Sequence, residues 1–257
     1  MLLAIDIGNT NTVLGLYHKD NLVHHWRLET KKERTADEWA IFLKELLQFE
    51  KKQFSEITDV VISNVVPSMQ RAITEMCSRY IKKNPLIVGP EIKIDMPIET
   101  DNPSEVGADR IVNAVAAFHR FKTHLIIVDF GTATTFDYVS AEGEYCGGLI
   151  VPGVGISAEA LFTRASQLPR VDIAKPKKVV GKNTVECMQS GIYYGYVCLV
   201  DGVIEKMEKE IGHKAKVLAT GGLAHLIAQD SKRIDAVDEF ITLEGLKLIY
   251  DWNCPGP

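Results

Sequence analysis

Short apolar runs separated by polar turns open the chain. They predict a β-meander of three strands, at residues 2–7, 12–17 and 22–28. Only the third run alternates apolar and polar positions along its length. That alternation is typical of a strand with one solvated face, whereas a continuous apolar run indicates a buried strand.

Helix and strand patterns then alternate up to residue 88. Apolar residues recur at i, i+3 and i+4 through Phe49, and Thr35 with Glu38 fits a capping box at the start of this helix. A buried strand is predicted at 59–66, followed by a helix over 68–81 and a short strand at 86–88. The first half therefore has the order βββαβαβ.

The second half repeats this plan. Strands are predicted at 125–128, 134–139 and 145–151, with a glycine-spaced loop at 152–157 that opens a helix. A last strand at 217–220 and an amphipathic helix at 240–250 close the chain. The duplication predicts two α/β domains, 1–120 and 121–257. The expected fold has two ribonuclease-H-like (actin-like ATPase) halves, each a mixed five-stranded sheet with flanking helices.

The longest helical pattern, residues 185–211, is apolar on more than one side. A surface helix needs only one apolar stripe. The excess indicates burial inside a large domain or a contact between subunits. We expect a homodimer that buries part of this helix, since a monomer would expose a large apolar patch.

Two polar turns after apolar strands carry candidate chemistry, and they read Asp6-Ile7-Gly8-Asn9-Thr10-Asn11-Thr12 and Asp129-Phe130-Gly131-Thr132-Ala133-Thr134-Thr135. Glycine permits a tight turn whose N–H groups, with neighbouring Thr hydroxyls, can point at a phosphate. A carboxylate beside a bound phosphate requires a cation between them, because two anions repel. Either turn alone fits an Asp-capped hairpin. The pair favours two halves that hold a nucleotide.

A polar loop from Asp101 leads to Asp109 and Arg110 at the start of a helix predicted over 111–121. An Asp in this place can serve only as a helix cap. With the neighbouring Arg, the pair offers one group that forks onto a carboxylate or phosphate and one that accepts a proton.

Composition narrows the function classes. The chain has 257 residues, 46% hydrophobic and 25% charged, with a net charge of −5, which favours neither nucleic acid nor an anionic membrane as partner. Its five cysteines are scattered and contain no C-x-x-C pair. We expect reduced thiols in a cytoplasmic protein, without a signal peptide or a membrane span.

With these residues in view, the chain resembles the type III pantothenate kinases over nearly its whole length. Four blocks carry the resemblance: 6–12, Gly107-Ala108-Asp109-Arg110, 129–135, and Gly147-Gly148-Leu149-Ile150-Val151-Pro152-Gly153. The resemblance implies ATP-dependent phosphorylation of pantothenate, the first step of coenzyme A synthesis, by a homodimer that needs Mg²⁺ and a monovalent cation, K⁺ or NH₄⁺.

The resemblance also implies roles for individual residues. ATP would be held by Asp6, Ile7, Gly8, Asn9, Thr10, Asn11, Thr12, Val13 and Thr132. Pantothenate would be held by Gly107, Ala108, Asp109, Arg110 and Thr184, with Asp109 as general base and Asp129 as the ligand of the monovalent cation. Many relatives place a Tyr seven residues before the Gly-Ala-Asp-Arg block, where this chain has Thr100, so that substrate contact is smaller or made otherwise.

Two other functions fit an actin-like fold: a phosphatase or polyphosphate hydrolase, in which water replaces the alcohol, and a non-catalytic ATP-binding regulator. Arg110 beside Asp109 favours a kinase over a hydrolase, because a kinase needs a group that binds the acceptor. Intact Asp6, Asp109 and Asp129 argue against the regulator.

Overall fold

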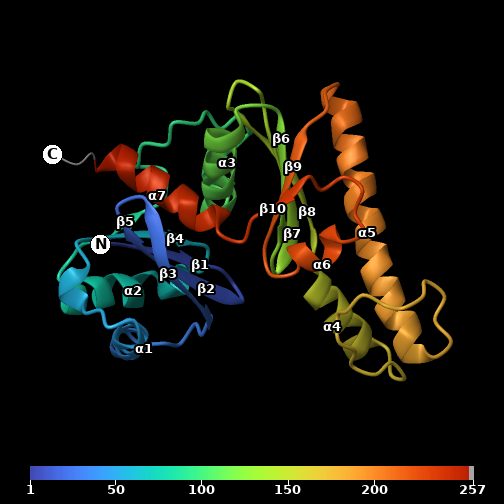
Figure 1. The fold of residues 1–257 in the computed structure, drawn as a ribbon, viewed down its shortest axis with the longest axis horizontal. Coiled ribbons are helices and arrows are strands. Elements are labelled where there is room, and N and C mark those ends of the chain that lie inside the picture. Colours follow the sequence, from blue (N-terminus) through green and yellow to red (C-terminus); the bar gives the residue numbers. More distant parts are fainter. Residues whose placement is uncertain (255–257) are drawn as a thin grey trace. The chain divides into compact units, whose positions relative to one another are not determined.

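The computed structural model describes residues 1–254 and contains two compact units (Figure 1). Unit 1 comprises residues 1–95, 102–116 and the chain from Ile241 onward, and unit 2 comprises 96–101 and 117–240. The expected boundary after residue 120 and the observed one at 116/117 both lie within one helix. The segment Met96–Asp101, called the strap below, was expected in the first domain and belongs to unit 2. The C-terminal helix was expected in the second domain and belongs to unit 1.

Unit 1 is built on a five-stranded mixed sheet in the order β3-β2-β1-β4-β5. Its strands are β1 (Leu2–Ile7), β2 (Asn11–His18), β3 (Asn21–Glu29), β4 (Asp59–Asn64) and β5 (Leu86–Ile87). The meander pairs antiparallel, whereas β4 lies parallel to β1 and β5 parallel to β4. β1 and β4 are the most apolar runs because both of their faces are buried.

Helices α1 (Ala36–Phe49) and α2 (Gln70–Met76) lie on the same side of this sheet (Figure 1). The predicted capping box at Thr35 and Glu38 is confirmed. The helix predicted over 68–81 is three pieces, a 3₁₀ turn (Pro67–Met69), α2 and a π-helical turn (Cys77–Ile81). Two further 3₁₀ turns occur at Phe54–Glu56 and Pro103–Glu105.

The apolar stripe of α1 packs into the core except at Phe42 and at Phe49, which is 79% exposed. Trp39, Leu43 and Leu47 are buried, whereas Phe42 is 43% exposed. The guanidinium of Arg34 lies 4.3 Å from the centre of the Phe42 ring and 4.8 Å from that of Trp39. Phe42 therefore covers a cation and does not enter the core.

Helix α3 (Ala108–Phe121) starts earlier than the predicted Ile111, and the C-terminal helix is α7 (Ile241–Asn253). α7 contacts β1 and β4, which explains its place in unit 1. A Cβ at Gly245 would lie 2.1 Å from the carbonyl oxygen of Val112, so glycine is required where α7 crosses α3. Thr242 on α7 also donates a hydrogen bond to Asn113 on α3, at 2.7 Å.

Unit 2 repeats the sheet of unit 1, in the order β10-β9-β6-β7-β8. Its strands are β6 (Leu125–Phe130), β7 (Ala133–Val139), β8 (Tyr145–Pro152), β9 (Lys216–Thr220) and β10 (Ala236–Val237). Its helices are α4 (Val154–Arg164), α5 (Thr184–Ile211) and α6 (Ala224–Ala228). The prediction of two halves with mixed five-stranded sheets is confirmed. α6 and β10 were not predicted, because both are too short to show a period.

α5 runs along the sheet of unit 2 (Figure 1) and is mostly a core element. Its apolar side chains Met188, Ile192, Tyr193, Tyr196, Val197, Val200 and Ile204 are buried. Val185 is its one exposed large apolar side chain among the described residues. The apolar excess thus reflects burial within unit 2, and the expected large patch on this helix is absent from the described chain.

None of the helices in residues 1–254 combines the length and apolar character needed to cross a membrane. All five cysteines are free thiols. Cys77 is buried, and burial raises the pKa of its thiol to about 12. It is therefore a packing residue at neutral pH.

Candidate active site

The first predicted phosphate turn joins β1 to β2 in unit 1. The N–H of Gly8 donates to the carbonyl of Asn11 at 3.0 Å, which closes the turn and leaves Asn9 and Thr10 exposed at its tip. Asp6 is half-buried and lies in register with Val13 on β2 and Ser63 on β4. The carboxylate therefore sits at the end of a buried strand, next to an exposed turn.

Thr30, which follows β3, stabilises this turn through hydrogen bonds. It was not among the predicted site residues. Its hydroxyl donates to the carbonyl of Gly8 at 2.7 Å, and its N–H donates to the carbonyl of Thr10 at 2.9 Å. The Thr12 and Thr30 hydroxyl oxygens lie 2.9 Å apart. Because the Thr30 proton is used by Gly8, Thr12 is the donor in this pair. Nothing in the local sequence distinguishes Thr30, since only strand pairing brings it to the turn.

The second cluster of unit 1 is the start of α3. The carbonyl of Gly107 accepts from the N–H groups of Arg110 and Ile111, at 3.1 and 3.3 Å. Asp109 Oδ1 accepts from the N–H of Arg110 at 2.8 Å. A Cβ at Gly107 would lie 2.6 Å from Asp109 Oδ1, so the glycine makes room for the folded-back carboxylate. Asp109 lies in the first turn of the helix rather than ahead of it.

Unit 2 places Asp129 at the end of β6, in register with Thr135 on β7 and Thr220 on β9. A Cβ at Gly221 would lie 2.6 Å from Asp129 Oδ1, and one at Gly131 would lie 3.6 Å from it. Gly221 therefore makes room for this carboxylate, whereas a Cβ at Gly131 would be in ordinary contact with it. A carboxylate oxygen is the ligand type that hard cations prefer.

Thr132 is exposed on the turn that follows β6. Its carbonyl accepts from the N–H of Gly153 at 3.1 Å, and a Cβ at Gly153 would meet that carbonyl oxygen at 2.2 Å. The turn is thereby fastened to the start of α4. The hydroxyl of Tyr196 on α5 donates to the carbonyl of Pro152 at 2.8 Å and holds the same loop from the other side.

Thr184 and Thr100 also lie in unit 2. Thr184 is the first residue of α5, and Asn183 caps the helix by accepting from the N–H of Glu186 at 2.9 Å. Thr100 lies in the strap, with its Oγ1 buried and without a hydrogen-bond partner among the described residues. The predicted residues are thus divided between unit 1 (6–13 and 107–110) and unit 2 (Thr100, Asp129, Thr132 and Thr184).

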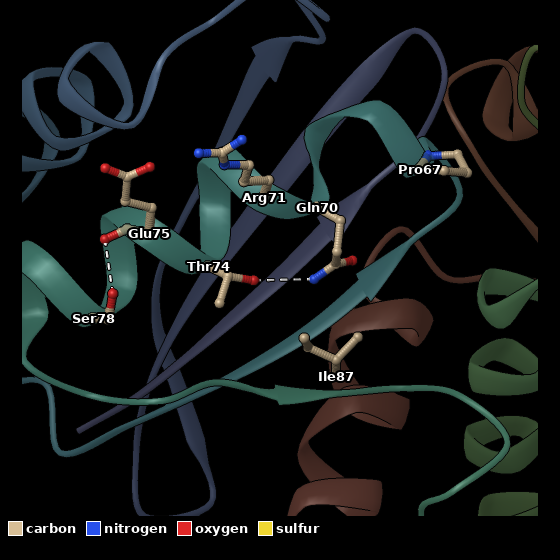
Figure 2. Close-up of a pocket in the computed structure, with 7 residues that line it drawn as sticks. All are labelled: Pro67, Gln70, Arg71, Thr74, Glu75, Ser78 and Ile87. Carbon is tan, nitrogen blue, oxygen red and sulfur yellow. Dashed lines mark hydrogen bonds between the residues drawn. The ribbon is translucent and has the colours of Figure 1, made fainter.

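A cavity of about 550 Å³ lies elsewhere in unit 1, along α2 beside the edge strand β5 (Figure 2). It is lined by Pro67, Gln70, Arg71, Thr74, Glu75, Ser78 and Ile87, none of them a predicted site residue. Figure 2 shows Gln70 donating to Thr74, at 3.2 Å, while Arg71 and Glu75 point to the same side of the helix. Within residues 1–254, no cluster of three or more His, Cys, Asp or Glu side chains forms a metal site.

Comparisons with known proteins agree with the motifs. The family model for type III pantothenate kinase matches residues 2–206. Type III pantothenate kinases of Citrifermentans bemidjiense, Geotalea daltonii and Halalkalibacterium halodurans are 55%, 56% and 53% identical to this chain, and each alignment covers 98% of it. The alignments cover 100%, 99% and 100% of those relatives.

Solved structures show the same fold at low identity. A Sinorhizobium meliloti protein described as a candidate 2-dehydro-3-deoxygalactonokinase matches with a TM-score of 0.62 at 13% identity, over 100% of this chain and 98% of that one. The activator of 2-hydroxyisocaproyl-CoA dehydratase from Clostridium difficile, solved with bound ADPNP, matches with a TM-score of 0.55 at 11% identity, over 97% and 94%. The actin-like fold expected from the strand order is confirmed, and by its sequence the chain belongs to the type III pantothenate kinase family.

Proposed function

We propose that this chain transfers the γ-phosphoryl group of ATP to the primary hydroxyl of pantothenate and forms 4′-phosphopantothenate, the first step of coenzyme A synthesis. The observation that carries the proposal is the alignment with type III pantothenate kinases at 53–56% identity over 98% of the chain. It gives no support to a hydrolase or a regulator. The blocks at both glycine turns and at the start of α3 are intact.

The nucleotide phosphates bind at residues 6–13 of unit 1 and at Thr132 of unit 2. The hairpin turn after Asp6 supports this assignment, because its tip is exposed while Thr30 holds its base through two hydrogen bonds. A rigid turn presents its N–H groups without an ordering cost when phosphate binds. Thr132 is likewise exposed on a turn whose carbonyl is fixed by Gly153.

The acceptor binds at Gly107, Ala108, Asp109 and Arg110, with Thr100 and Thr184 as further contacts. Arg110 forks onto the pantothenate carboxylate, which leaves the hydroxyl at the other end of the substrate to reach the phosphate. The start of α3 favours an anionic group through the positive end of the helix dipole.

Asp109 is the general base. A primary alcohol has a very high pKa, so the proton moves to an oxygen of Asp109 only as the new O–P bond forms. Placement of the carboxylate matters more than its pKa. The hydrogen bond from the Arg110 N–H to Oδ1 and the space at Gly107 hold one oxygen in place, so that the other can accept the proton.

Two cations complete the proposed site. Mg²⁺ and a monovalent cation, K⁺ or NH₄⁺, neutralise phosphate oxygens when bound. Asp6 is the carboxylate nearest in sequence to the phosphate turn, and Asp129 is the proposed ligand of the monovalent ion. The position of Asp129 at the end of β6, three residues before Thr132, is consistent with an ion beside the phosphates.

We also propose a homodimer located in the cytoplasm. Large exposed apolar side chains gather in one part of the sequence of unit 2: Leu149, Ile150, Ile156, Leu161, Phe162, Val179, Val180 and Val185. Such a set favours a protein partner. The proposed dimer surface is therefore formed mainly by β8, α4 and the segment before α5, and less by the body of α5. Light scattering at micromolar concentration tests this, and a monomer would count against it.

A coupled assay of ADP release tests the reaction. With purified protein, ATP and Mg²⁺, ADP release should require pantothenate and should rise when K⁺ replaces a bulky organic cation. Equal ADP release with and without pantothenate would support the hydrolase instead. Absence of ADP release under all conditions, from a protein that binds ATP, would support the regulator.

A further inference from the structure

The proposed reaction gives no role to two buried carboxylates of the described chain, Asp137 and Glu208. Asp137, on β7, is the more deeply buried, at 0% exposed. Its Oδ1 accepts from the hydroxyl of Tyr145 at 2.6 Å and its Oδ2 accepts from the hydroxyl of Thr135 at 3.0 Å. A buried carboxylate is costly even when it is hydrogen-bonded, and an apolar pair of the same volume would serve stability as well. Its presence points to a role in positioning.

Tyr145 connects Asp137 to the strap. Its ring is 0% exposed, and it is the first residue of β8. Its N–H donates to the carbonyl of Pro97, and its carbonyl accepts from the N–H of Glu99, both at 2.8 Å. Ile98 forms a parallel bridge with it. The strap therefore pairs with the start of β8 through a single bridge, at the same residue whose side chain bonds Asp137.

The start of β8 is shaped to receive the strap. β8 has a bulge at Cys146, since Val139 pairs with Tyr145 and Tyr138 pairs with Gly147. Gly147 has φ +99°, and a Cβ there would lie 3.7 Å from Thr100 Cγ2. A Cβ at Gly148, which pairs with Asp137, would meet the carbonyl oxygen of Phe136 at 1.8 Å. Gly148 thus allows β7 to lie close to this strand, and the methyl group of Thr100 lies near Gly147 at a distance that would still accommodate a Cβ.

Thr100 is the strap residue placed among the acceptor contacts. Its Oγ1 is buried without a hydrogen-bond partner among residues 1–254. A buried hydroxyl in that state costs free energy, which a ligand that supplies the missing partner would recover. The position of this hydroxyl depends on the strap, and the strap depends on Tyr145.

We propose that Asp137 and Tyr145 are positioning residues, which hold the strap so that Thr100 meets the acceptor substrate. This inference rests on the proposed function, because it takes pantothenate as the acceptor. The Tyr145 hydroxyl ties the start of β8 to Asp137, and the backbone of Tyr145 ties the strap to β8.

Steady-state kinetics of Tyr145→Phe and Asp137→Asn test the proposal. The KM for pantothenate should rise about tenfold in Tyr145→Phe, the equivalent of one lost hydrogen bond, while the KM for ATP and the K⁺ response stay near wild type. The rise should be smaller in Asp137→Asn, because its amide oxygen can still accept from the Tyr145 hydroxyl. Thr135→Val is the matched control. It removes the other hydroxyl donor to Asp137 but makes no contact with the strap, so its KM for pantothenate should stay near wild type. An equal rise in the control would overturn the proposal.

Hydrogen exchange gives a readout that does not depend on the substrate. The Glu99 amide should exchange faster in Tyr145→Phe and Asp137→Asn than in wild type, while the amides of β6 stay protected. Unchanged Glu99 exchange would overturn the proposal, as would faster exchange with an unchanged KM. If the wild-type protein phosphorylates no pantothenate, the proposed function fails. The exchange data still test separately whether Asp137 and Tyr145 hold the strap. Tyr145→Phe keeps the ring, so it carries the test if Asp137→Asn does not fold.

Discussion

Gly221→Ala is the substitution whose effect follows most directly from the structure. Gly221 follows β9 with φ +91°, a conformation that L-residues rarely adopt. A Cβ there would lie 2.6 Å from Asp129 Oδ1 and 2.7 Å from the backbone N and C of Phe130. The side chain of Asp129 could swing away, but the backbone of a central strand cannot.

The cost has two parts. The left-handed backbone costs an L-residue about 1–2 kcal/mol. Overpacking against a fixed backbone costs about 1–3 kcal/mol more. The expected loss in the free energy of unfolding is therefore about 2–5 kcal/mol, a large part of the stability of an ordinary domain. The displaced Asp129 should also bind the monovalent cation more weakly, which a raised K⁺ requirement would show.

Gly212→Ala is the matched control. Gly212 ends α5 with φ +75°, and nothing lies within 4 Å of a Cβ built there. Its free energy of unfolding should fall only by the cost of the left-handed backbone, about 1–2 kcal/mol, and its K⁺ response should match that of the wild type. Urea unfolding and potassium titrations on the three proteins give the comparison. Equal losses in the two variants, with identical K⁺ responses, would refute the reasoning from contact at Asp129.

Three other substitutions have defined outcomes. Asp109→Asn should lower kcat by about two to four powers of ten without a change in melting temperature, and near-normal kcat in the folded variant would end the general-base assignment. Asp129→Asn should flatten the response of the rate to K⁺. Equal rates of the wild-type enzyme in K⁺ and in a bulky organic cation would contradict the proposed cation site. Burial raises the pKa of Glu208, but hydrogen bonds from Lys214, Arg233 and the Ala215 N–H outweigh it and hold this pKa below 4.5. Its stabilising contribution is present above pH 4.5 and lost as pH falls through the lower folded value, so Glu208→Gln should be less stable than wild type at pH 7 and approach it in acid.

Local patterning was enough to predict most strands and the long helices. The three strands of each meander are apolar runs that end in turn residues, and period alone separates them from α1 and α5. The capping box at Thr35 is a four-residue signal and was predicted correctly. The two Asp-X-Gly turns were found by the same local reasoning, because each follows its strand directly.

Contacts between distant segments could not be predicted in this way. Thr30 reaches the phosphate turn only because β3 pairs with β2, and Tyr145 reaches Asp137 only because of the bulge in β8. The assignment of α7 to unit 1 depends on its packing against β1 and β4. The helix pattern at 185–211 allowed two explanations, and only the packed sheet distinguishes burial in unit 2 from an exposed patch.

The division has a physical cause. Turns, caps and strand runs depend on backbone conformation and side-chain chemistry within a few residues, so the sequence carries them directly. The anchor of the strap and the room around Asp129 depend on which strands pair, in which register, and on which glycines lie opposite them. A shift of register by a single residue turns every side chain of a strand to the other face of the sheet. Within each unit, therefore, only the tertiary structure decides which distant side chains come together.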